Sequence, residues 1–228
     1  MAMAPMRRMM DNIILNSNSP IASAMFFSFD GIDGVGKSTQ MRLFEEALRG
    51  RGLDVVVCRD PGSTPLGERI REVLLSSDSA TPIGRRSEML LYMAARAQLV
   101  EQIIKPALEA GRIVVSDRFL LANVVYQGHA GGLDPQQIWR VGQVATQGIL
   151  PSCVFLLDMS VEAANARLNR SLDRMENQGQ DYRQLLRQGF LDEAAESNGR
   201  IHVIDANRPV GAVQADIWKI AAEMLRLG

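Results

Sequence analysis

The chain has 228 residues, a formal net charge of −1 and 25 Lys and Arg residues against 26 Asp and Glu residues. This length suits one α/β domain, and the balanced charge argues against a surface for a nucleic acid polymer and against a basic membrane-binding patch. Two cysteines in apolar runs, two widely separated histidines and no apolar run of transmembrane length predict a cytoplasmic protein with reduced thiols and no metal-ligand motif.

The first 24 residues differ from the rest of the chain, because they are rich in Met, Asn, Ser and Ala and show no apolar period. The apolar run at residues 13–15 is too short for the core of a signal peptide. We therefore expect residues 1–24 to be a disordered extension and residues 25–228 to form the folded domain.

One stretch, from Phe26 to Gln40, reads FFSFDGIDGVGKSTQ and fits G-x-x-x-x-G-K-[ST] between an expected strand and an expected helix. The glycines let backbone N–H groups surround phosphate oxygens, Lys37 brings a positive charge to the β and γ phosphates, and the Ser38 hydroxyl is a hard ligand for Mg²⁺. The motif predicts a nucleoside triphosphate site but does not separate a kinase from a GTPase or an ATPase motor. The residues expected at the ATP are Gly31, Ile32, Asp33, Gly34, Val35, Gly36, Lys37, Ser38 and Thr39.

Short apolar runs alternate with helical periods along the remaining chain. The expected strands cover residues 25–30, 54–59, 112–117, 153–158 and 200–205. The expected helices cover residues 37–49, 66–75, 82–105, 119–126, 135–146, a segment capped by Ser160, 181–197 and 210–227, with an Arg-rich mobile loop or frayed helix at 169–180. This alternation predicts a P-loop NTPase fold of three layers, in which helices flank a five-stranded parallel sheet on both faces.

Polar side chains follow two of the expected strands where those strands end. Arg59 leads into a loop braced by two prolines, residues 60–65, which suits a fixed phosphate clamp. Asp117 ends the third strand, as a Mg²⁺-linked acid should, and Arg118 follows it. Open α/β sheets bind ligands at the carboxyl edge, so we expect these groups to meet there. A solvated Arg59 and an N-capping Asp117 remain the alternatives.

A third group of polar side chains falls on expected helices. Asn123 and Tyr126 are three residues apart on the helix of residues 119–126, and Tyr92 and Arg96 are four apart on the long helix. An aromatic plane with a guanidinium one turn further along can stack on a base and donate to its edge. Ordinary helix core with a solvated Arg96 is the alternative.

Together these patches resemble the thymidylate kinase (dTMP kinase) family of P-loop nucleoside monophosphate kinases, from about residue 25 to the C-terminus. The resemblance implies phosphorylation of dTMP to dTDP with ATP and Mg²⁺, in dTTP synthesis, by a homodimer formed through the long helix near residues 89–99. The similar segments, in order, are FDGIDGVGKSTQ, RDPGSTPLGERIRE, EMLLYMAARAQLVEQIIKPAL, SDRF, NVVYQG, LDRMENQG and VIDANRPV.

The resemblance also implies roles for single residues. In the donor site, Ser38 and Asp117 would lie at Mg²⁺, and the backbone of Ala206 and Asn207 would meet adenine. In the acceptor site the implied residues are Asp33 at the 3′-hydroxyl, Arg59 and Arg118 at the phosphate, Tyr92 stacked on thymine, Arg96 and Asn123 at the thymine edge, Tyr126 at the ribose 2′ position, and Gln127.

The chain departs from the family pattern at several positions. The family usually has Glu at Asp60 and Gly at Ser63, and it often has Glu at Asp30 and Ser at Ala122. The changes at Asp60, Asp30 and Ala122 shorten or remove a polar group, and they weaken any metal or phosphate role for Asp60. Only Gly34 and Val35 stand between Asp33 and Gly36, so the P-loop supplies no arginine to join Lys37 and Arg118 in catalysis. The lid must bring one, and the candidates are Arg167, Arg170 and Arg174.

Other functions stay open. A thymine methyl group needs only a small apolar pocket, so dUMP or another nucleoside monophosphate is a second possible acceptor. A P-loop switch or ATPase that acts through a partner would have no use for Tyr92, Arg96 and Asn123 as a set that contacts a base. The apolar faces assigned to a homodimer fit the core of a monomer equally well.

Overall fold

The computed structural model describes residues 24–75, 82–168 and 179–227. The predicted extension and most of the predicted lid, including Arg170 and Arg174, lie outside this part of the chain. The strands are β1 (Phe26–Asp30), β2 (Val55–Arg59), β3 (Ile113–Asp117), β4 (Cys153–Asp158) and β5 (Ile201–Asp205). The helices are α1 (Lys37–Arg49), α2 (Pro65–Leu75), α3 (Arg85–Leu99), η2 (Val100–Ile104), α4 (Lys105–Glu109), α5 (Leu120–Asn123), η3 (Val124–His129), α6 (Pro135–Thr146), α7 (Val161–Ala166), α8 (Gln180–Glu196) and α9 (Val210–Leu225).

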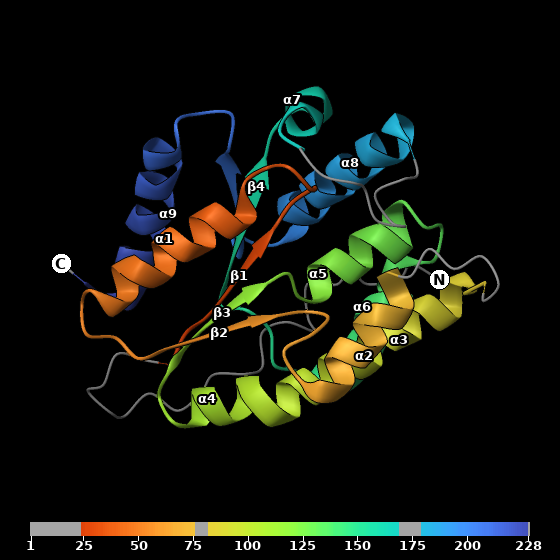
Figure 1. Ribbon diagram of the computed structural model, residues 1–228, viewed down its shortest axis with the longest axis horizontal. Helices are drawn as coiled ribbons and strands as arrows, with labels where there is room; N and C mark the ends of the chain where they lie inside the picture. Colours follow the sequence, from red (N-terminus) through yellow and green to blue (C-terminus); the bar gives the residue numbers. More distant parts are fainter. Residues whose placement is uncertain (1–23, 76–81, 169–178, 228) are drawn as a thin grey trace, which may run out of the picture.

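The strands form one five-stranded sheet in the order β2-β3-β1-β4-β5 (Figure 1), and each neighbouring pair is parallel. The predicted α/β class and the parallel sheet are confirmed. Every residue of β1 is buried, because helices cover this central strand on both faces. The carboxyl ends of all five strands therefore meet at one edge of the sheet.

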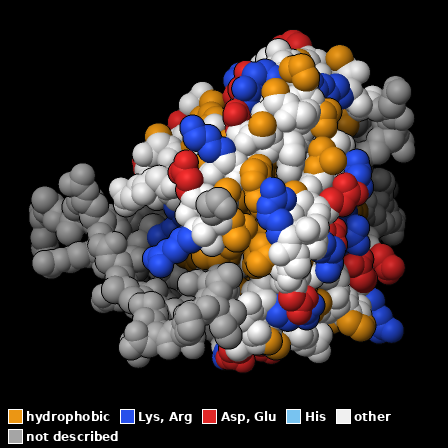
Figure 2. All heavy atoms as spheres, turned by 90° about the vertical axis from the view of Figure 1, so that its left-hand side faces the viewer, with side chains coloured by type: hydrophobic (Ala, Val, Ile, Leu, Met, Phe, Trp, Pro, Cys, Tyr) orange, Lys and Arg blue, Asp and Glu red, His pale blue; other side chains and the backbone are white. Residues whose placement is uncertain are grey.

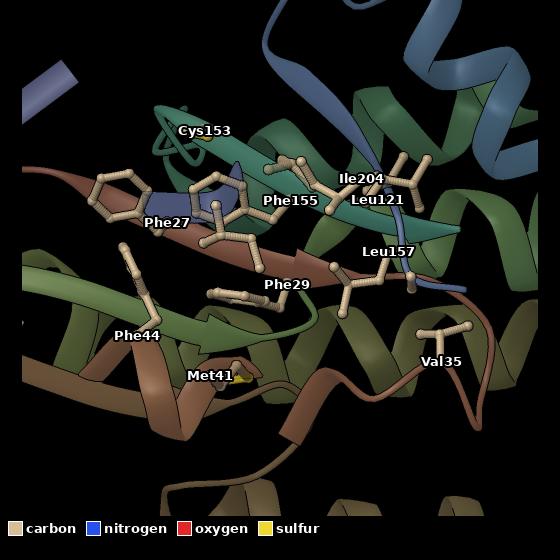
Figure 3. Packing of buried hydrophobic residues seen from close by; sticks show 14 of the residues in the cluster. Phe27, Phe29, Val35, Met41, Phe44, Leu121, Cys153, Phe155, Leu157 and Ile204 are labelled. Atoms are coloured by element: carbon tan, nitrogen blue, oxygen red, sulfur yellow. The ribbon is translucent and has the colours of Figure 1, made fainter. Parts of the chain in front are cut away.

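Helices occupy both faces of the sheet, with α1 and α9 together on one side and α2, α3 and α4 on the other (Figure 1). On the first side, the ring of Phe44 from α1 lies 5.2 Å from that of Phe27 and 5.6 Å from that of Phe155. Figure 3 shows these aromatic side chains packed between α1 and the strands β1 and β4. Phe26, whose side chain points to the opposite face, packs in a second apolar cluster against α3 and η2.

The long helix runs further than the sequence predicts. A stop at Lys105, before Pro106, is wrong, because the chain passes through the π-helical turn η2 and continues as α4 to Glu109. Proline has no N–H to donate to the carbonyl four residues earlier. It lies here in the first turn after η2, where the wider π-helical geometry lets the helical path continue. Another π-helical turn, η3, extends the predicted helix of residues 119–126 to His129.

Figure 2 shows that basic and acidic side chains are interspersed on the face that forms the left of Figure 1, as the net charge of −1 leads one to expect. None of the helices in the described ranges combines the length and the apolar character needed to cross a bilayer.

We expect Phe44→Ala to lower the free energy of unfolding by about 3–5 kcal/mol, because it leaves a cavity among fully buried rings. Urea denaturation followed by circular dichroism measures this change. Glu109→Ala, at an exposed helix end, is the control and should change the stability by less than about 0.5 kcal/mol. Equal stabilities for the two variants would contradict the central role of this aromatic cluster.

Candidate active site

A cavity of about 950 Å³ lies at the carboxyl edge of the sheet, where the P-loop faces α3, α5 and η3. Its volume is at the upper end of the usual range for a ligand site. It brings together most of the residues that the sequence predicts for the site: Asp33, Gly34, Val35, Gly36, Lys37, Ser38, Thr39, Arg59, Tyr92, Arg96, Asp117, Arg118, Asn123, Tyr126, Gln127 and Ala206.

The P-loop depends on glycines at two close approaches. Gly31 has φ +133°, and a Cβ there would lie 2.4 Å from the carbonyl oxygen of Leu157. Gly34 has φ +94°, and a Cβ there would lie 2.2 Å from the carbonyl oxygen of Ala164. The loop is thus pressed against the end of β4 and against α7, and it leads into α1, whose N-terminus faces the cavity.

Lys37 is buried and turned toward the loop itself. Its Nζ donates to the carbonyl oxygens of Gly31 at 3.0 Å and Ile32 at 2.9 Å, and to Asp33 Oδ1 at 3.3 Å. Burial, together with the charge of Arg118, lowers the pKa of Lys37, and neighbouring carboxylates offset part of this shift. The carbonyl groups of the predicted ATP-binding residues Gly31 and Ile32 therefore hold this ammonium group at the cavity.

Asp33 is the hub of the hydrogen bonds in this half of the cavity. Its Oδ1 accepts from Arg118 Nη2 at 2.7 Å, and its Oδ2 accepts from the Tyr126 hydroxyl at 3.1 Å. Burial raises the pKa of Asp33, but the charges of Arg118 and Lys37 outweigh burial and hold it well below the usual range. Asp33 is therefore an ionised acceptor that ties the P-loop to β3 and η3.

Arg118 reaches Asp33 from an unusual backbone conformation, with φ +62°. Its own N–H donates to the carbonyl oxygen of Phe29 at 3.0 Å, and its carbonyl oxygen accepts from the Ser116 hydroxyl at 2.6 Å. Contacts with β1 and β3 thus hold this left-handed residue at the sheet edge and direct its guanidinium into the cavity. Such strain commonly occurs at functional sites.

At the other end of the cavity, five buried polar side chains form a continuous series, which we call the polar chain. Arg96 Nε donates to Asp60 Oδ2 at 2.5 Å, and Arg96 Nη1 donates to Asn123 Oδ1 at 3.0 Å. Asn123 Nδ2 donates to Gln127 Oε1 at 2.6 Å, and Gln127 Nε2 donates to Glu88 Oε1 at 2.9 Å. Arg96 is not the solvated side chain of the alternative interpretation, because it is 1 % exposed.

Two arginines on the β2 side line the middle of the cavity. Arg59 donates to both carboxylate oxygens of Glu68 at 2.9 Å. Arg71, on α2, donates to the carbonyl oxygen of Pro61 at 3.2 Å, and burial beside Arg59 lowers its pKa. The sequence analysis missed Arg71. A basic residue on the helix after the Arg59 loop, one turn beyond Leu66, was the only sign in the sequence that Arg71 could reach the site.

The far wall of the cavity, near the P-loop, comes from the end of β5. Ala206 lines it, and its carbonyl oxygen accepts from Arg167 Nη1 at 3.3 Å. Arg208 also lines this wall and was not predicted, whereas the predicted Asn207 is exposed beside it. Of the three lid candidates, Arg167 is the one that the described residues include.

The cavity joins a phosphate-binding loop to a polar pocket, as in a nucleotide kinase. Comparison with known proteins identifies the family of kinases. The sequence model of a family described as Thymidylate kinase matches residues 29–217. The chain belongs to the thymidylate kinase family. It is 42% identical over 229 residues to a thymidylate kinase of Rhodopirellula baltica, covering 94% of this chain and 93% of that protein.

Further thymidylate kinases are similar over most of their length. One of Symbiobacterium thermophilum is 42% identical over 207 residues, covering 89% of this chain and 94% of that protein. The crystal structure of a thymidylate kinase from Ehrlichia chaffeensis superposes with a TM-score of 0.70 at 28% identity, covering 87% of this chain and 99% of that chain. The chain is therefore a phosphotransferase, and its P-loop fold is that of the family.

Two departures from the thymidylate kinase pattern have structural explanations. Asp60, where the family usually has Glu, pairs with Arg96, and burial raises its pKa although that arginine opposes the shift. Ser63, where the family usually has Gly, has φ +63°, a conformation that favours glycine. The Ser63 hydroxyl accepts from the Arg59 N–H at 2.8 Å, which stabilises the loop.

Asp30, at the end of β1, is fully buried beneath the P-loop. Its Oδ2 accepts from the Ser28 hydroxyl at 3.1 Å, and its Oδ1 has no hydrogen-bond partner. Burial raises the pKa of Asp30 to about 6, although Arg118 and Lys37 oppose the shift. Between the ordinary pKa of 3.8 and about 6, the folded state binds more protons at this group than the unfolded state does. Its contribution to stability therefore falls as the pH rises through this window.

We expect Asp30→Asn to remove this pH dependence. The free energy of unfolding of the variant minus that of the wild type should rise by about 2.4 kcal/mol between pH 4 and pH 7, because only the wild type must ionise a buried carboxyl. Urea denaturation at both pH values measures the difference. The exposed Asp192→Asn serves as the control, and its difference from wild type should not vary. A difference for Asp30→Asn that is equally constant would contradict the raised pKa.

Proposed function

We propose that the chain transfers the γ-phosphoryl group of ATP to the phosphate of dTMP, giving ADP and dTDP. The observation that carries this proposal is that one cavity joins the P-loop to the polar chain, with arginines between them. A donor triphosphate and an acceptor nucleotide can thus lie in one enclosed space with their phosphates toward each other.

The acceptor base would occupy the end of the cavity that the polar chain lines. Tyr92 lies at this end and offers a ring for stacking, while Arg96, Asn123 and Gln127 offer donors and acceptors to the base edge. Tyr126, which is buried against Asp33, would crowd the ribose 2′ position and so favour deoxyribose.

The acceptor phosphate would meet Arg59, Arg71 and Arg118, since all three line the cavity between the base end and the P-loop. Asp33 is an ionised acceptor and suits the 3′-hydroxyl of the acceptor. The Arg59–Glu68 pair is partly exposed and can rearrange when a phosphate offers Arg59 a second anionic partner.

In the transfer, an oxygen of the dTMP phosphate forms a bond to the γ-phosphorus of ATP. The bond from that phosphorus to the β–γ bridging oxygen breaks, and its electron pair leaves with ADP. The acceptor oxygen is already anionic, so no general base is required. Lys37 would exchange its carbonyl partners for phosphate oxygens, and with Arg118 it would offset negative charge on the transferred group.

The residues at the P-loop fit a Mg²⁺ ion. Asp117 Oδ1 is a buried carboxylate oxygen with no hydrogen-bond partner, and the Ser38 hydroxyl is exposed on the same cavity wall. The described residues hold no cluster of three or more carboxylate, His or Cys side chains for a metal. In the proposed site, phosphate oxygens would complete the ligand shell. Bound there, Mg²⁺ would neutralise charge on the triphosphate.

A further cation would come from the lid. We propose Arg170 or Arg174, which lie outside the described residues, with Arg167 as the third candidate. Closure of this stretch over ATP would exclude water and so prevent hydrolysis. We also propose a cytoplasmic location, which the free, buried thiols of Cys58 and Cys153 support.

The decisive experiment measures ADP formation from ATP·Mg²⁺ with dTMP, dUMP, dCMP, dGMP, UMP or no acceptor. We expect strong stimulation by dTMP, and we expect Asn123→Ala to weaken it at least about tenfold, because a buried hydrogen bond to the base is lost. Lys37→Met should abolish activity with every acceptor. ADP formation at one rate with and without every acceptor would instead indicate a partner-dependent ATPase, and a preference for another nucleotide would change the substrate.

We further propose a homodimer formed through α3 and α6, which pack against each other. Each carries a large apolar side chain in the solvent: Leu90 is 53% exposed and Val144 is 81% exposed. Exposed apolar side chains on adjacent helices are typical of a subunit interface.

We expect the double substitution Leu90→Asp and Val144→Asp to dissociate the dimer, because it places charges in an apolar interface. Light scattering after gel filtration should give twice the chain mass of 25.1 kDa for the wild type and a single chain mass for the variant. Leu185→Asp, at a side chain 53% exposed on α8, is the matched control and should stay dimeric. A monomeric wild type would contradict the proposal.

A further inference from the structure

Glu88 belongs to the polar chain but not to the cavity wall. It lies in the first turn of α3, is 7 % exposed, and accepts from Gln127 Nε2 at 2.9 Å. The members of the polar chain that line the cavity are Asp60, Arg96, Asn123 and Gln127. Glu88 therefore stands behind the residues proposed to contact the base.

The two amides of the polar chain have a fixed orientation, because the groups on either side of them, Arg96 and Glu88, have opposite hydrogen-bonding character. Arg96 has only N–H donors, so the oxygen of the Asn123 amide must face it. A carboxylate has only acceptors, so the nitrogen of the Gln127 amide must face Glu88. The contact between the two amides, from Asn123 Nδ2 to Gln127 Oε1, satisfies both conditions at once.

Rotation of either amide by half a turn would break this pattern. With Gln127 reversed, its oxygen would face the carboxylate of Glu88 and its nitrogen would face that of Asn123. With both amides reversed, the nitrogen of Asn123 would face the guanidinium of Arg96. Each mismatch sets two donors or two acceptors against each other in a buried position, which is unfavourable, and more so where one of them is charged.

The pyrimidines differ in the same property. Thymine and uracil present an N3–H donor and an O4 acceptor, whereas cytosine presents an N3 acceptor and an N4 amino donor. To bind a base edge with the inverted pattern, the amides of Asn123 and Gln127 would have to exchange the positions of their oxygen and nitrogen atoms. If the two amides cannot reverse, the site binds a base with one pattern of donor and acceptor and rejects a base with the other.

We propose that Glu88 is a positioning residue that selects thymine and uracil over cytosine by fixing the orientation of the Gln127 and Asn123 amides. This inference rests on the proposed function, in which these amides contact the base. It assigns the choice between base edges to a residue that touches no substrate. The choice between dTMP and dUMP is independent of Glu88, because these two bases share one edge pattern.

Glu88→Gln tests the proposal, because an amide can donate or accept and so permits either orientation. The measurement is kcat and KM for dTMP, dUMP and dCMP at saturating ATP·Mg²⁺. We expect the ratio of kcat/KM for dTMP to that for dCMP to fall about tenfold, a partial loss since Arg96 still fixes the other end. The dTMP to dUMP ratio should stay constant, and the change for dTMP should lie mainly in KM, because base contacts are distant from the transferred group.

Two controls separate the possible causes. Glu109→Gln makes the same chemical change at the exposed end of the same helical path and should leave both ratios unaltered. Glu88→Asp keeps an acceptor-only group and should retain the dTMP to dCMP ratio. Partial unfolding lowers the three rates by one factor and does not alter their ratios.

An unchanged dTMP to dCMP ratio in Glu88→Gln would overturn the proposal. A fall of equal size in Glu88→Asp would also overturn it, because packing rather than hydrogen-bond direction would then set the choice. Failure of the proposed function looks different: in that case, the wild type itself would show no dTMP-dependent ADP formation.

Discussion

The parallel alignment of β1 with β3 and β4 is the constraint on which the cavity depends. It places the P-loop after β1, Asp117 and Arg118 after β3, and Arg59 after β2 at one edge of the sheet. Helices must cover both faces of such a sheet, and the same helices bring the polar chain to this edge. The core and the site are therefore consequences of one arrangement, since Ile32 and Val35 of the P-loop belong to the same apolar cluster as the aromatic rings.

One partly buried and one fully buried ion pair mark the two ends of the cavity. The Asp33–Arg118 pair joins the P-loop to the loop after β3, and the Asp60–Arg96 pair joins the loop after β2 to α3. Such pairs contribute little net stability, because desolvation offsets much of their attraction. Their value here is positional, since a buried guanidinium with fixed partners presents its remaining donors in a defined direction. The two pairs give the cavity two rigid ends, which suit the phosphate and the base of the proposed function.

Much of the site could be predicted because its chemistry follows strand ends. The P-loop motif, Arg59, Asp117 and Arg118 could each be predicted from a short apolar run followed by polar residues. Of the residues expected at the ATP in the P-loop, only Gly31 and Ile32 do not line the cavity. Arg71 and Arg208 were missed, since each is one basic residue among many until the fold brings it to the cavity. The continuation of the helix past Pro106 was missed because a π-helical turn has no simple periodic signal.

The sequence by itself determined the class of fold, the phosphate-binding loop and the family, because these depend on local patterns and on motifs in a fixed order. Only the tertiary structure decided the partners of the buried groups. Asp60 and Glu88 lie 28 residues apart, yet both accept hydrogen bonds in the polar chain, Asp60 from Arg96 and Glu88 from Gln127. Hydrogen bonds act over about 3 Å. Their direction is therefore set by which side chains the packed helices bring into contact, and no spacing along the sequence specifies that.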